Sequence, residues 1–315
     1  MITPKNRVLI SAVPFGEFDQ TTLNPLREAE LEVVMATHGS REYDRGLETA
    51  VGIIAGTEPL GINELNRARF LKVISRCGIG LDNIDLQEVQ RKGIALKNTP
   101  EAPTLAVAEF ALALILSSLR NIAKADRAIR RGGWAPEKGE LLDGKTVGIV
   151  GLGRVGRRLA ELLEPFRVHL IAFEAAPQEE FVRRHQIVLV RTIDEVFQKS
   201  DIVTLHLPLT GDPTHRVGER LLRFMKPRAL LINTARGALI DEKALLRALR
   251  EEWIAGAALD TFDTEPYGGP LVECENVILT SHMASYARES RVRMEKEAVS
   301  NLLAELDGEK NLWKP

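Results

Sequence analysis

Short runs of branched apolar residues alternate with amphipathic stretches along most of the chain, and this alternation limits the possible folds more than any other feature. One series of runs predicts strands at residues 8–12, 31–35, 51–54, 71–74 and 94–96. A second series predicts strands at residues 146–150, 170–173, 187–190, 202–205, 230–232, 255–259 and 277–279. Strands that alternate with helices are typical of parallel sheets with helices on both faces. We therefore predict an α/β fold that contains two parallel sheets.

The two series are separated by a short segment rich in proline. Pro100 and Pro103 lack a backbone N–H and resist helix formation, and a long apolar helix is predicted to begin directly after them. Thr104 is suited to cap that helix. The apolar stretch is interrupted by Glu109 and followed by Arg120, so it is too short to span a bilayer. We predict a buried helix and no membrane association.

Composition and charge exclude several classes of protein. The 315 residues are enough for two domains of ordinary size. The formal net charge is -2, so no basic excess points to a nucleic-acid partner. Cys77 and Cys274 form neither a CxxC pair nor a disulfide framework, and the polar start, Met1 to Arg7, does not read as a signal peptide. A reducing, cytoplasmic location is therefore expected, and no residue cluster has metal-ligand spacing.

The strongest local motif is a glycine-rich loop between a predicted strand and a predicted helix, and it reads Gly151-Leu-Gly153-Arg-Val-Gly156. Gly151 allows a tight turn, Gly153 lets the backbone approach a pyrophosphate, and Gly156 permits close packing of helix on strand. The pyrophosphate would bind the N–H groups that are free at the start of the helix. Because the strand and the helix flank the motif in the required order, the loop predicts a dinucleotide site.

The strand after this helix ends in an acidic residue, Glu174. A carboxylate at this place would accept hydrogen bonds from both hydroxyls of the adenosine ribose and would repel a 2′-phosphate. The sequence therefore predicts NAD as the cofactor, in preference to NADP. A plain surface glutamate is the structural alternative, because Glu174 is longer than the usual aspartate and is followed by Ala175-Ala176-Pro177.

Four polar residues stand at or shortly after the ends of predicted strands in the second series. They are Arg236, Asp260, Glu265 and His282. In open α/β sheets ligands bind outside the carboxyl ends of the strands, so these side chains are expected to converge on one crevice. Taken one at a time, each is more often a surface ion-pair partner or a hydrogen-bonded structural residue.

Taken together, the motifs resemble the D-2-hydroxyacid dehydrogenase family, and its phosphoglycerate dehydrogenase branch in particular. The resemblance extends in family order from about residue 8 to about residue 306. It is carried by the glycine-rich loop and by Arg76-Cys-Gly-Ile-Gly-Leu-Asp-Asn-Ile-Asp85, Asn98-Thr-Pro, Val107-Ala-Glu109, His206-Leu-Pro208, Asn233-Thr-Ala-Arg-Gly, Ala257-Ala-Leu-Asp-Thr-Phe and Glu265-Pro.

The resemblance implies a fold of two Rossmann-like parallel-sheet domains, with a cofactor domain inserted into a discontinuous flavodoxin-like substrate domain. The NAD-binding domain would span residues 103–283, and the substrate domain would combine residues 1–102 and 284–315. Members of the family are usually dimers, so we expect a homodimer, with the helix from Thr104 as a contributor.

The resemblance also implies a catalytic group of three residues. His282 would take the hydroxyl proton in oxidation and return it in reduction, a task suited to a side chain with a reference pKa of about 6.5. Glu265 would hydrogen-bond the other ring nitrogen and stabilise the imidazolium. Arg236 would bind the substrate carboxylate and polarise the carbonyl oxygen.

Further contacts are implied by the same resemblance. The loop Cys77-Gly78-Ile79-Gly80 would offer backbone N–H groups to the substrate carboxylate, and Asp260 would anchor the nicotinamide carboxamide. His206 is open to a second reading, in which it only holds the loop beside the cofactor. The remaining cofactor contacts would come from Arg154, Val155, Leu207, Pro208, Thr234, Ala235, Arg236, His282, Ala284 and Thr104.

The expected activity is NAD-dependent hydride transfer between nicotinamide and C2 of a small D-2-hydroxy acid or 2-keto acid, with 3-phosphoglycerate as one candidate. Many phosphoglycerate dehydrogenases carry an arginine-serine pair where this chain has Gly56 and Thr57, and Glu58 adds a negative charge. A hydroxypyruvate or glyoxylate reductase is therefore an alternative substrate class. A non-catalytic NAD-sensing protein like the co-repressors of this fold is a second alternative, which the lack of a long tail disfavours.

Overall fold

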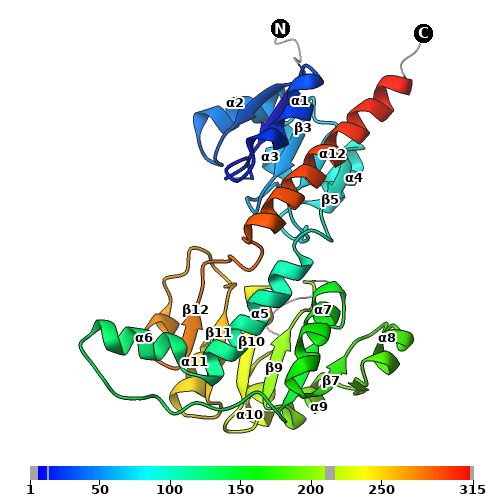
Figure 1. The fold of residues 1–315 in the computed structure, drawn as a ribbon. Helices are drawn as coiled ribbons and strands as arrows, with labels where there is room; N and C mark the ends of the chain where they lie inside the picture. The colour runs from blue at the N-terminus through cyan, green and yellow to red at the C-terminus, as the bar shows by residue number, and fades with distance from the viewer. Residues whose placement is uncertain (1–5, 13, 210–216, 313–315) are drawn as a thin grey trace. The chain divides into compact units, whose positions relative to one another are not determined.

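A computed structural model describes residues 6–12, 14–209 and 217–312, and the chain divides into two compact units. Unit 1 combines Met1–Pro103 with Tyr286–Pro315, and unit 2 is the continuous segment Thr104–Ser285 (Figure 1). Both units contain a parallel sheet with helices on its two faces, so the predicted fold class is confirmed. Most of the polar start of the chain, residues 1–5, lies outside the described residues.

Unit 1 has a five-stranded sheet in the order β2-β1-β3-β4-β5, the flavodoxin-like order. Its elements are β1 (Arg7–Ile10), η1 (Gln20–Leu23), α1 (Asn24–Glu28), β2 (Glu32–Met35), α2 (Arg41–Thr49), β3 (Gly52–Ala55), α3 (Ile62–Arg67), β4 (Val73–Arg76), α4 (Leu86–Lys92), β5 (Ala95–Asn98) and α12 (Arg288–Leu312).

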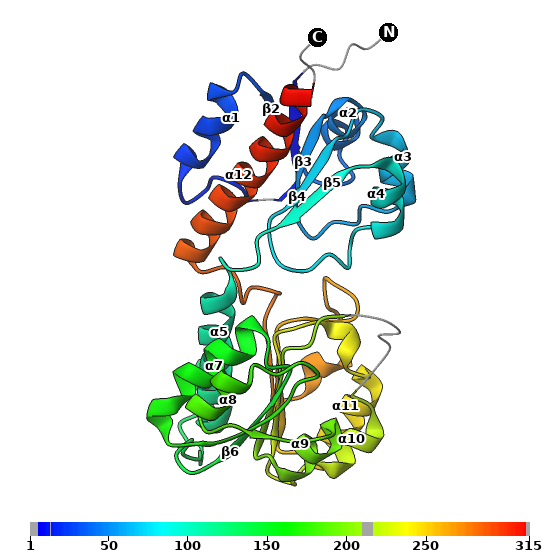
Figure 2. The ribbon, with the colours of Figure 1, turned by 90° about the vertical axis from the view of Figure 1, so that its right-hand side faces the viewer.

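Both faces of this sheet are buried, because its central strands carry apolar side chains on each side. In Figure 2, α1 and α12 lie on one face, and α2, α3 and α4 lie on the other. Leu302 of α12 is fully buried and lies so close to β3 that an added Cβ at Gly52 would be 3.0 Å from it. Burial of one such leucine contributes about 1.5–3 kcal/mol. The last long helix of the chain is therefore part of the core of the first unit.

Unit 2 has a seven-stranded parallel sheet in the order β12-β11-β10-β9-β6-β7-β8. Its elements are α5 (Thr104–Leu119), α6 (Ile122–Arg130), β6 (Thr146–Val150), α7 (Arg154–Leu163), η2 (Glu164–Phe166), β7 (His169–Phe173), α8 (Glu179–Arg184), β8 (Val188–Leu189), α9 (Ile193–Lys199), β9 (Ile202–Leu205), α10 (Glu219–Phe224), β10 (Leu230–Asn233), η3 (Gly237–Leu239), α11 (Glu242–Arg250), β11 (Gly256–Leu259), η4 (Pro270–Glu273) and β12 (Val277–Leu279).

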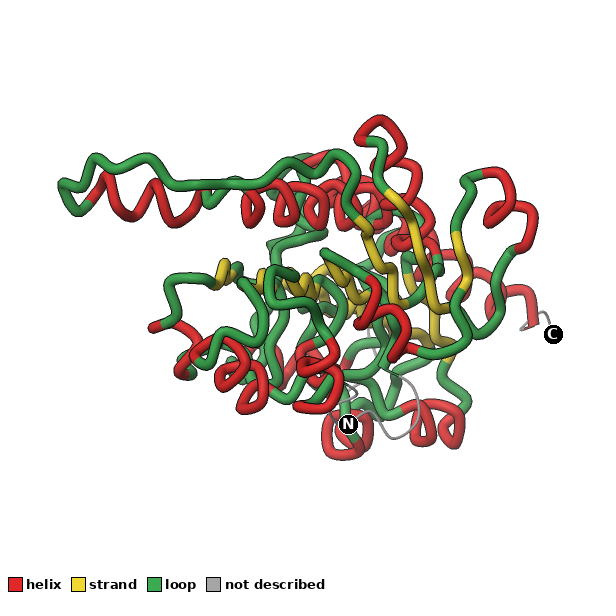
Figure 3. The backbone as a smooth tube through the Cα atoms, turned by 90° about the horizontal axis from the view of Figure 1, so that it is seen from below, coloured by secondary structure: helices red, strands yellow, loops and turns green. Residues whose placement is uncertain are grey.

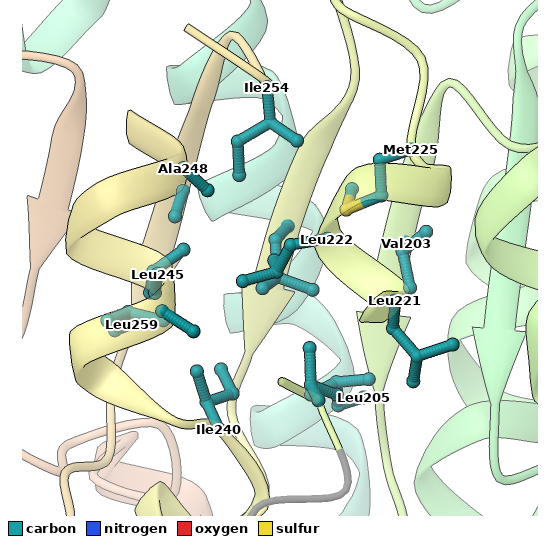
Figure 4. Packing of buried hydrophobic residues seen from close by; sticks show 14 of the residues in the cluster. Val203, Leu205, Leu221, Leu222, Met225, Ile240, Leu245, Ala248, Ile254 and Leu259 are labelled. Carbon is teal, nitrogen blue, oxygen red and sulfur yellow. The ribbon is translucent and has the colours of Figure 1, made fainter. Parts of the chain in front are cut away.

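Two apolar clusters cover the faces of the seven-stranded sheet. On one face, leucines of α10 and α11 pack against β9 and β11, as Figure 4 shows for Leu222, Leu245 and Leu259. On the other face, α5 and α7 pack against β6 and its neighbours. Because both faces are covered, the central strands of this sheet are buried and their residues are mostly apolar.

The segment that contains α6 is the exception to this packing. This helix is amphipathic, yet none of its residues is buried. Figures 1 and 3 show it extending away from the rest of unit 2. Exposed apolar side chains on α6 and the following loop belong to Ile122, Ile129, Trp134 and Leu141. Among the described residues no single helix is long and apolar enough to cross a membrane. The helices α5 and α6 together have sufficient length and apolar composition, but they are bent by 63° relative to each other.

Candidate active site at the carboxyl edge of the seven-stranded sheet

The strands of unit 2 run parallel, so their carboxyl ends form a single edge. Nearly all the predicted cofactor and catalytic residues of this unit follow directly or closely after these ends. Gly151 follows β6, Glu174 follows β7, His206 follows β9, Thr234 to Arg236 follow β10, Asp260 follows β11, and His282 and Ala284 come shortly after β12. Thr104 is the first residue of α5. The fold therefore gathers one half of the predicted site at the edge where α/β sheets bind ligands.

The glycine-rich loop lies where the direction of the strand order reverses, between β6 and β9. Gly151 has φ +98°, and a Cβ there would be 2.8 Å from the backbone carbonyl of His206. A Cβ at Gly156 would be 2.2 Å from the carbonyl oxygen of Gly151, so helix α7 packs closely on the loop. Gly153 caps α7 and has no atom within 4 Å of an added Cβ. Its backbone is therefore open to a phosphate group.

Glu174 lies beside this loop and holds it. One oxygen of its carboxylate accepts the N–H of Leu152 at 2.8 Å, and the other accepts the N–H of Ala176 at 3.1 Å. The side chain is half-buried. The carboxylate thus stands next to the predicted pyrophosphate loop, at the end of the neighbouring strand β7.

His206 is the residue after β9, and its ring is held by the protein. Nε2 lies 2.9 Å from Oγ1 of Thr204. Burial lowers the pKa of His206 to about 4, so the ring is neutral near pH 7. Leu207, half-buried, packs against the apolar cluster, whereas Pro208 is exposed.

The loop after β10 is folded by the side chain of Asn233. Its Oδ1 accepts the N–H of Ala235 at 3.0 Å, and its Nδ2 donates to the carbonyl of Arg236 at 2.9 Å. The guanidinium of Arg236 donates to the carbonyl of Ala235 at 2.7 Å. The buried Oγ1 of Thr234 has no hydrogen-bond partner within the described part of the chain. This edge therefore carries a guanidinium and a buried hydroxyl without a partner among the described residues.

Asp260 is fully buried, and its carboxylate organises the turn that carries His282. Oδ1 accepts the hydroxyl of Thr280 at 2.6 Å and the N–H of Met283 at 2.9 Å, and Oδ2 accepts the N–H of Ala284 at 2.9 Å. His282 itself has φ +52°, a left-handed conformation that non-glycine residues rarely adopt. The bonds to Asp260 stabilise this conformation and determine where the imidazole lies.

Glu265 and His282 form a direct pair. Oε2 of Glu265 lies 2.9 Å from Nδ1 of His282, and Oε1 accepts the N–H of Phe262 at 3.0 Å. The two side chains are 36% and 35% exposed. Burial raises the pKa of the Glu265 carboxyl, but these hydrogen bonds and the charges of His282 and Arg236 outweigh it, so the pKa lies below its ordinary value. Glu265 is therefore ionised near neutral pH, and it is bonded to His282 and attracted by the charge of Arg236.

The predicted substrate loop belongs to unit 1 and follows β4. The N–H of Cys77 donates to the carbonyl of Ala55 at 2.9 Å, and the N–H of Gly78 donates to Thr99 Oγ1 at 2.8 Å. Two of the four predicted N–H donors are thus already used. Within the described residues, the N–H of Ile79 donates to no acceptor. Burial raises the pKa of the Cys77 thiol to about 11, so this thiol is neutral.

Several residues of the site did not emerge from the sequence. Thr99 and Thr280 hold the substrate loop and the histidine turn, although Thr99 was noted only as part of the Asn98-Thr-Pro motif and Thr280 only as a residue that precedes His282. The buried partners of Asp260 could not be inferred either, because they depend on how the turn folds. No group of three or more potential metal ligands occurs among the residues that the structure describes.

Comparison with known proteins agrees with this geometry. Residues 112–284 match the NAD-binding domain of the D-isomer specific 2-hydroxyacid dehydrogenases. A glyoxylate reductase of Thermofilum pendens is 42% identical over 261 residues, which cover 80% of this chain and 77% of that protein. A D-3-phosphoglycerate dehydrogenase of Methanocaldococcus jannaschii is 40% identical over 230 residues, which cover 72% of this chain and 44% of that protein.

A solved structure supports the same assignment over nearly the whole chain. The TT0316 protein from Thermus thermophilus has a TM-score of 0.86 and 34% sequence identity, with 96% of this chain and 97% of that chain covered. The chain therefore belongs to the D-isomer specific 2-hydroxyacid dehydrogenases, and it is an NAD-dependent oxidoreductase of that family.

Proposed function

We propose that this protein is a 2-keto acid reductase that acts on glyoxylate or hydroxypyruvate in preference to 3-phosphohydroxypyruvate. The observation that supports the activity is the Glu265–His282 pair, 2.9 Å between Oε2 and Nδ1, at the strand edge that also carries Arg236. Nδ1 is engaged by the carboxylate, and Nε2 is bonded to no other described residue. Nε2 is thus the atom that would exchange a proton with the substrate oxygen.

The roles of the three side chains follow from their chemistry. A reduced nicotinamide, when bound, would supply the hydride that C2 of the keto acid accepts. His282 donates the proton to the carbonyl oxygen, and ionised Glu265 stabilises the imidazolium before the transfer. Arg236 binds the carboxylate and draws electron density from the carbonyl. Asp260 acts here as a positioning residue, in addition to any contact with the carboxamide, because it holds the left-handed turn of His282.

The residues of the edge fit a dinucleotide. The open backbone at Gly153 suits a pyrophosphate, and the unpartnered hydroxyl of Thr234 offers a hydrogen bond to a ligand. Arg154 and Val155 begin the helix whose first N–H groups would bind the phosphates. Glu174 would accept the hydroxyls of the adenosine ribose from its place beside the loop. Leu207, Pro208 and Ala235 would line the cofactor.

The preference for a small substrate is argued from the loop after β3. Glu58 accepts the hydroxyl of Ser11 and, at 3.1 Å, the N–H of Gly56. Gly56 follows Ala55, whose carbonyl bonds to the N–H of Cys77, so this carboxylate stands beside the predicted substrate loop. A negative charge at this place disfavours a substrate with a second anionic group. The several relatives named glyoxylate reductase support the same choice.

A turnover assay tests the proposal. The protein is incubated with NADH and glyoxylate, hydroxypyruvate, pyruvate or 3-phosphohydroxypyruvate, and the absorbance of NADH is followed. We expect the highest kcat/KM with glyoxylate or hydroxypyruvate. A clear preference for 3-phosphohydroxypyruvate would refute the proposed substrate class, and no turnover of any keto acid would refute the proposed activity.

Replacement of Glu58 tests the substrate class directly. We expect Glu58→Gln to raise kcat/KM for 3-phosphohydroxypyruvate relative to glyoxylate by about tenfold, because one repelling charge is removed while the hydrogen-bond acceptor remains. Glu42→Gln is the control, since it removes the same charge from an exposed position on α2. An unchanged ratio in the Glu58 variant would show that this carboxylate plays no part in selection.

Replacement of Glu174 tests the cofactor contact. Glu174→Gln should raise KM for NADH by about tenfold, because charge-assisted hydrogen bonds contribute roughly 1.5–3 kcal/mol each. The same change should improve the use of NADPH, because the charge that repels a 2′-phosphate is lost. Glu180→Gln, on the exposed surface of nearby α8, is the control. If the ratio of the two cofactors stays at its wild-type value, the role given to Glu174 is wrong.

We also propose a homodimer and a cytoplasmic location. An amphipathic helix with no buried residue, α6, needs a partner for its apolar side, and Trp134 in the following loop is 89% exposed. A second copy of the chain would cover these residues, and a monomeric mass in light scattering would contradict this. Both cysteines are free thiols, in keeping with a reducing compartment.

A further inference from the structure

The loop of residues 77–80 in unit 1 is built around a buried arginine. Arg76 is the last residue of β4 and is only 7% exposed. Its Nε donates to the carbonyl of Gly80 at 3.1 Å, and its Nη1 donates to the carbonyl of Cys77. The buried guanidinium therefore binds a carbonyl at each end of the loop. The positive charge of Arg76 also acts on the neighbouring thiol of Cys77, whose pKa it lowers against the larger effect of burial.

Two side chains at the end of β5 complete this support. Nδ2 of Asn98 donates to the carbonyl of Ile79 at 2.8 Å, and Oγ1 of Thr99 accepts the N–H of Gly78 at 2.8 Å. The carbonyls of Cys77, Ile79 and Gly80 are thus all bound by side-chain donors. Because a peptide unit is planar and trans, a bound carbonyl directs the N–H of the following residue to the other side. The bond from Asn98 to the carbonyl of Ile79 thus orients the N–H of Gly80, and the bond from the N–H of Thr99 to the carbonyl of Gly78, 3.1 Å, orients the N–H of Ile79. Arg76 holds the two peptide units that flank these.

The consequence concerns the N–H groups of Ile79 and Gly80. Neither donates to any acceptor among the described residues, whereas the N–H groups of Cys77 and Gly78 are both used. Gly78 has φ +144°, and a Cβ there would lie 2.0 Å from Nη1 of Arg76. Only glycine at this position leaves room for the guanidinium. The Arg76-Cys-Gly sequence therefore encodes the support of the loop as well as its turn.

We propose that Arg76 is a positioning residue: by holding the carbonyls of Cys77 and Gly80 on either side, it fixes the loop so that the N–H groups of Ile79 and Gly80 can bind the carboxylate of the substrate. The inference rests on the proposed 2-keto acid reductase function. A guanidinium suits this task because its donors form a rigid fork that reaches two carbonyls at once, which a lysine cannot do. Its buried charge beneath the loop further favours the binding of an anion. Asn98 acts together with Arg76, because it binds the carbonyl of Ile79, which lies between the two carbonyls that Arg76 binds.

The first test separates substrate binding from chemistry. We expect Arg76→Lys and Arg76→Met to raise KM for glyoxylate by about tenfold or more, with kcat lowered less than KM is raised. The Kd for NADH, which binds unit 2, should stay at the wild-type value. Arg69→Met is the control, because Arg69 is exposed and precedes β4. An unchanged KM in a folded Arg76 variant would overturn the proposal.

The second test does not depend on turnover. In ¹⁵N-labelled protein, oxalate should shift the amide resonances of Ile79 and Gly80 in the wild type, and these shifts should be lost in Arg76→Met. Equal shifts in both proteins would overturn the role of Arg76. No shift in the wild type would overturn the N–H site itself, whether or not keto acids are reduced.

Asn98→Ala keeps the proposal testable if the Arg76 variants fail to fold, because Asn98 is only half-buried. Here the carbonyl of Ile79 loses its donor while the guanidinium stays in place. We expect KM for glyoxylate to rise severalfold, with smaller oxalate shifts at Gly80 than in the wild type. Wild-type values for both would contradict the proposed support of the loop.

Discussion

Replacement of His282 by glutamine is expected to lower kcat for glyoxylate reduction by about 10²–10⁴-fold, the contribution that a positioned acid–base group usually makes. The reason is that Nε2 would no longer supply a proton to the carbonyl oxygen. The turn should persist, because it is held by bonds from the backbone of Met283 and Ala284 to Asp260. The Kd for NADH and the melting temperature should therefore change little, and stopped-flow absorbance measures the loss in hydride transfer.

The chain offers a matched control for this experiment. His185 is also paired with a glutamate through Nδ1, the partner being Glu164, but it follows α8 outside the carboxyl edge. His185→Gln should keep kcat within about twofold of wild type, because this ring lies away from the carboxyl edge that carries the predicted site. The kcat of Glu265→Gln should lie between those of the two histidine variants, because the amide can still hydrogen-bond to the ring of His282 but carries no charge. Wild-type turnover in His282→Gln would end the proton-transfer assignment.

Replacement of Arg236 is expected to have an effect of similar size on kcat/KM. Two charge-assisted hydrogen bonds of roughly 1.5–3 kcal/mol each correspond to a loss of about 10²–10⁴-fold. Arg236→Gln should show the full loss, because both the charge and the fork disappear. Arg236→Lys should retain part of the activity, since the charge remains but two-point binding of the carboxylate does not. Steady-state kinetics with glyoxylate measures both.

The control for Arg236 comes from the other end of the same strand. Arg228 precedes β10 and pairs with Glu140, away from the carboxyl edge. Arg228→Gln should leave kcat/KM within about twofold of wild type. A second readout is the pH dependence of the reaction, because the charge of Arg236 helps to keep the pKa of Glu265 low. If Arg236→Lys retained full kcat/KM, bidentate binding of the substrate would be refuted.

Much of the fold could be predicted because its signals are local. Each run of branched apolar residues became a strand of one of the two parallel sheets. This includes the short, exposed edge strand β8, predicted at residues 187–190 and found at Val188–Leu189. The glycine-rich loop could also be predicted from the sequence, because close backbone contacts around one strand–turn–helix unit require glycine at positions 151 and 156. Contacts of this kind depend on neighbours in the chain.

The support of the site could not be predicted, because it depends on contacts between distant segments. Asp260 was expected to face the cofactor, yet its oxygens bind Thr280, Met283 and Ala284, twenty or more residues away. Glu174 was expected at the ribose, and the structure adds its bond to the N–H of Leu152. Of the four N–H groups predicted for the substrate loop, only those of Ile79 and Gly80 have no acceptor among the described residues.

The amino-acid sequence by itself determined the strands, the glycine-rich turn and the residue types at the carboxyl edge, because side-chain periodicity and backbone freedom act over a few residues. Only the tertiary structure decided which polar groups remain available. A hydrogen bond requires its partner within about 3 Å. That distance between Glu265 and His282, or between Arg76 and the carbonyl of Gly80, exists only after the strands have aligned and the loops have closed over them.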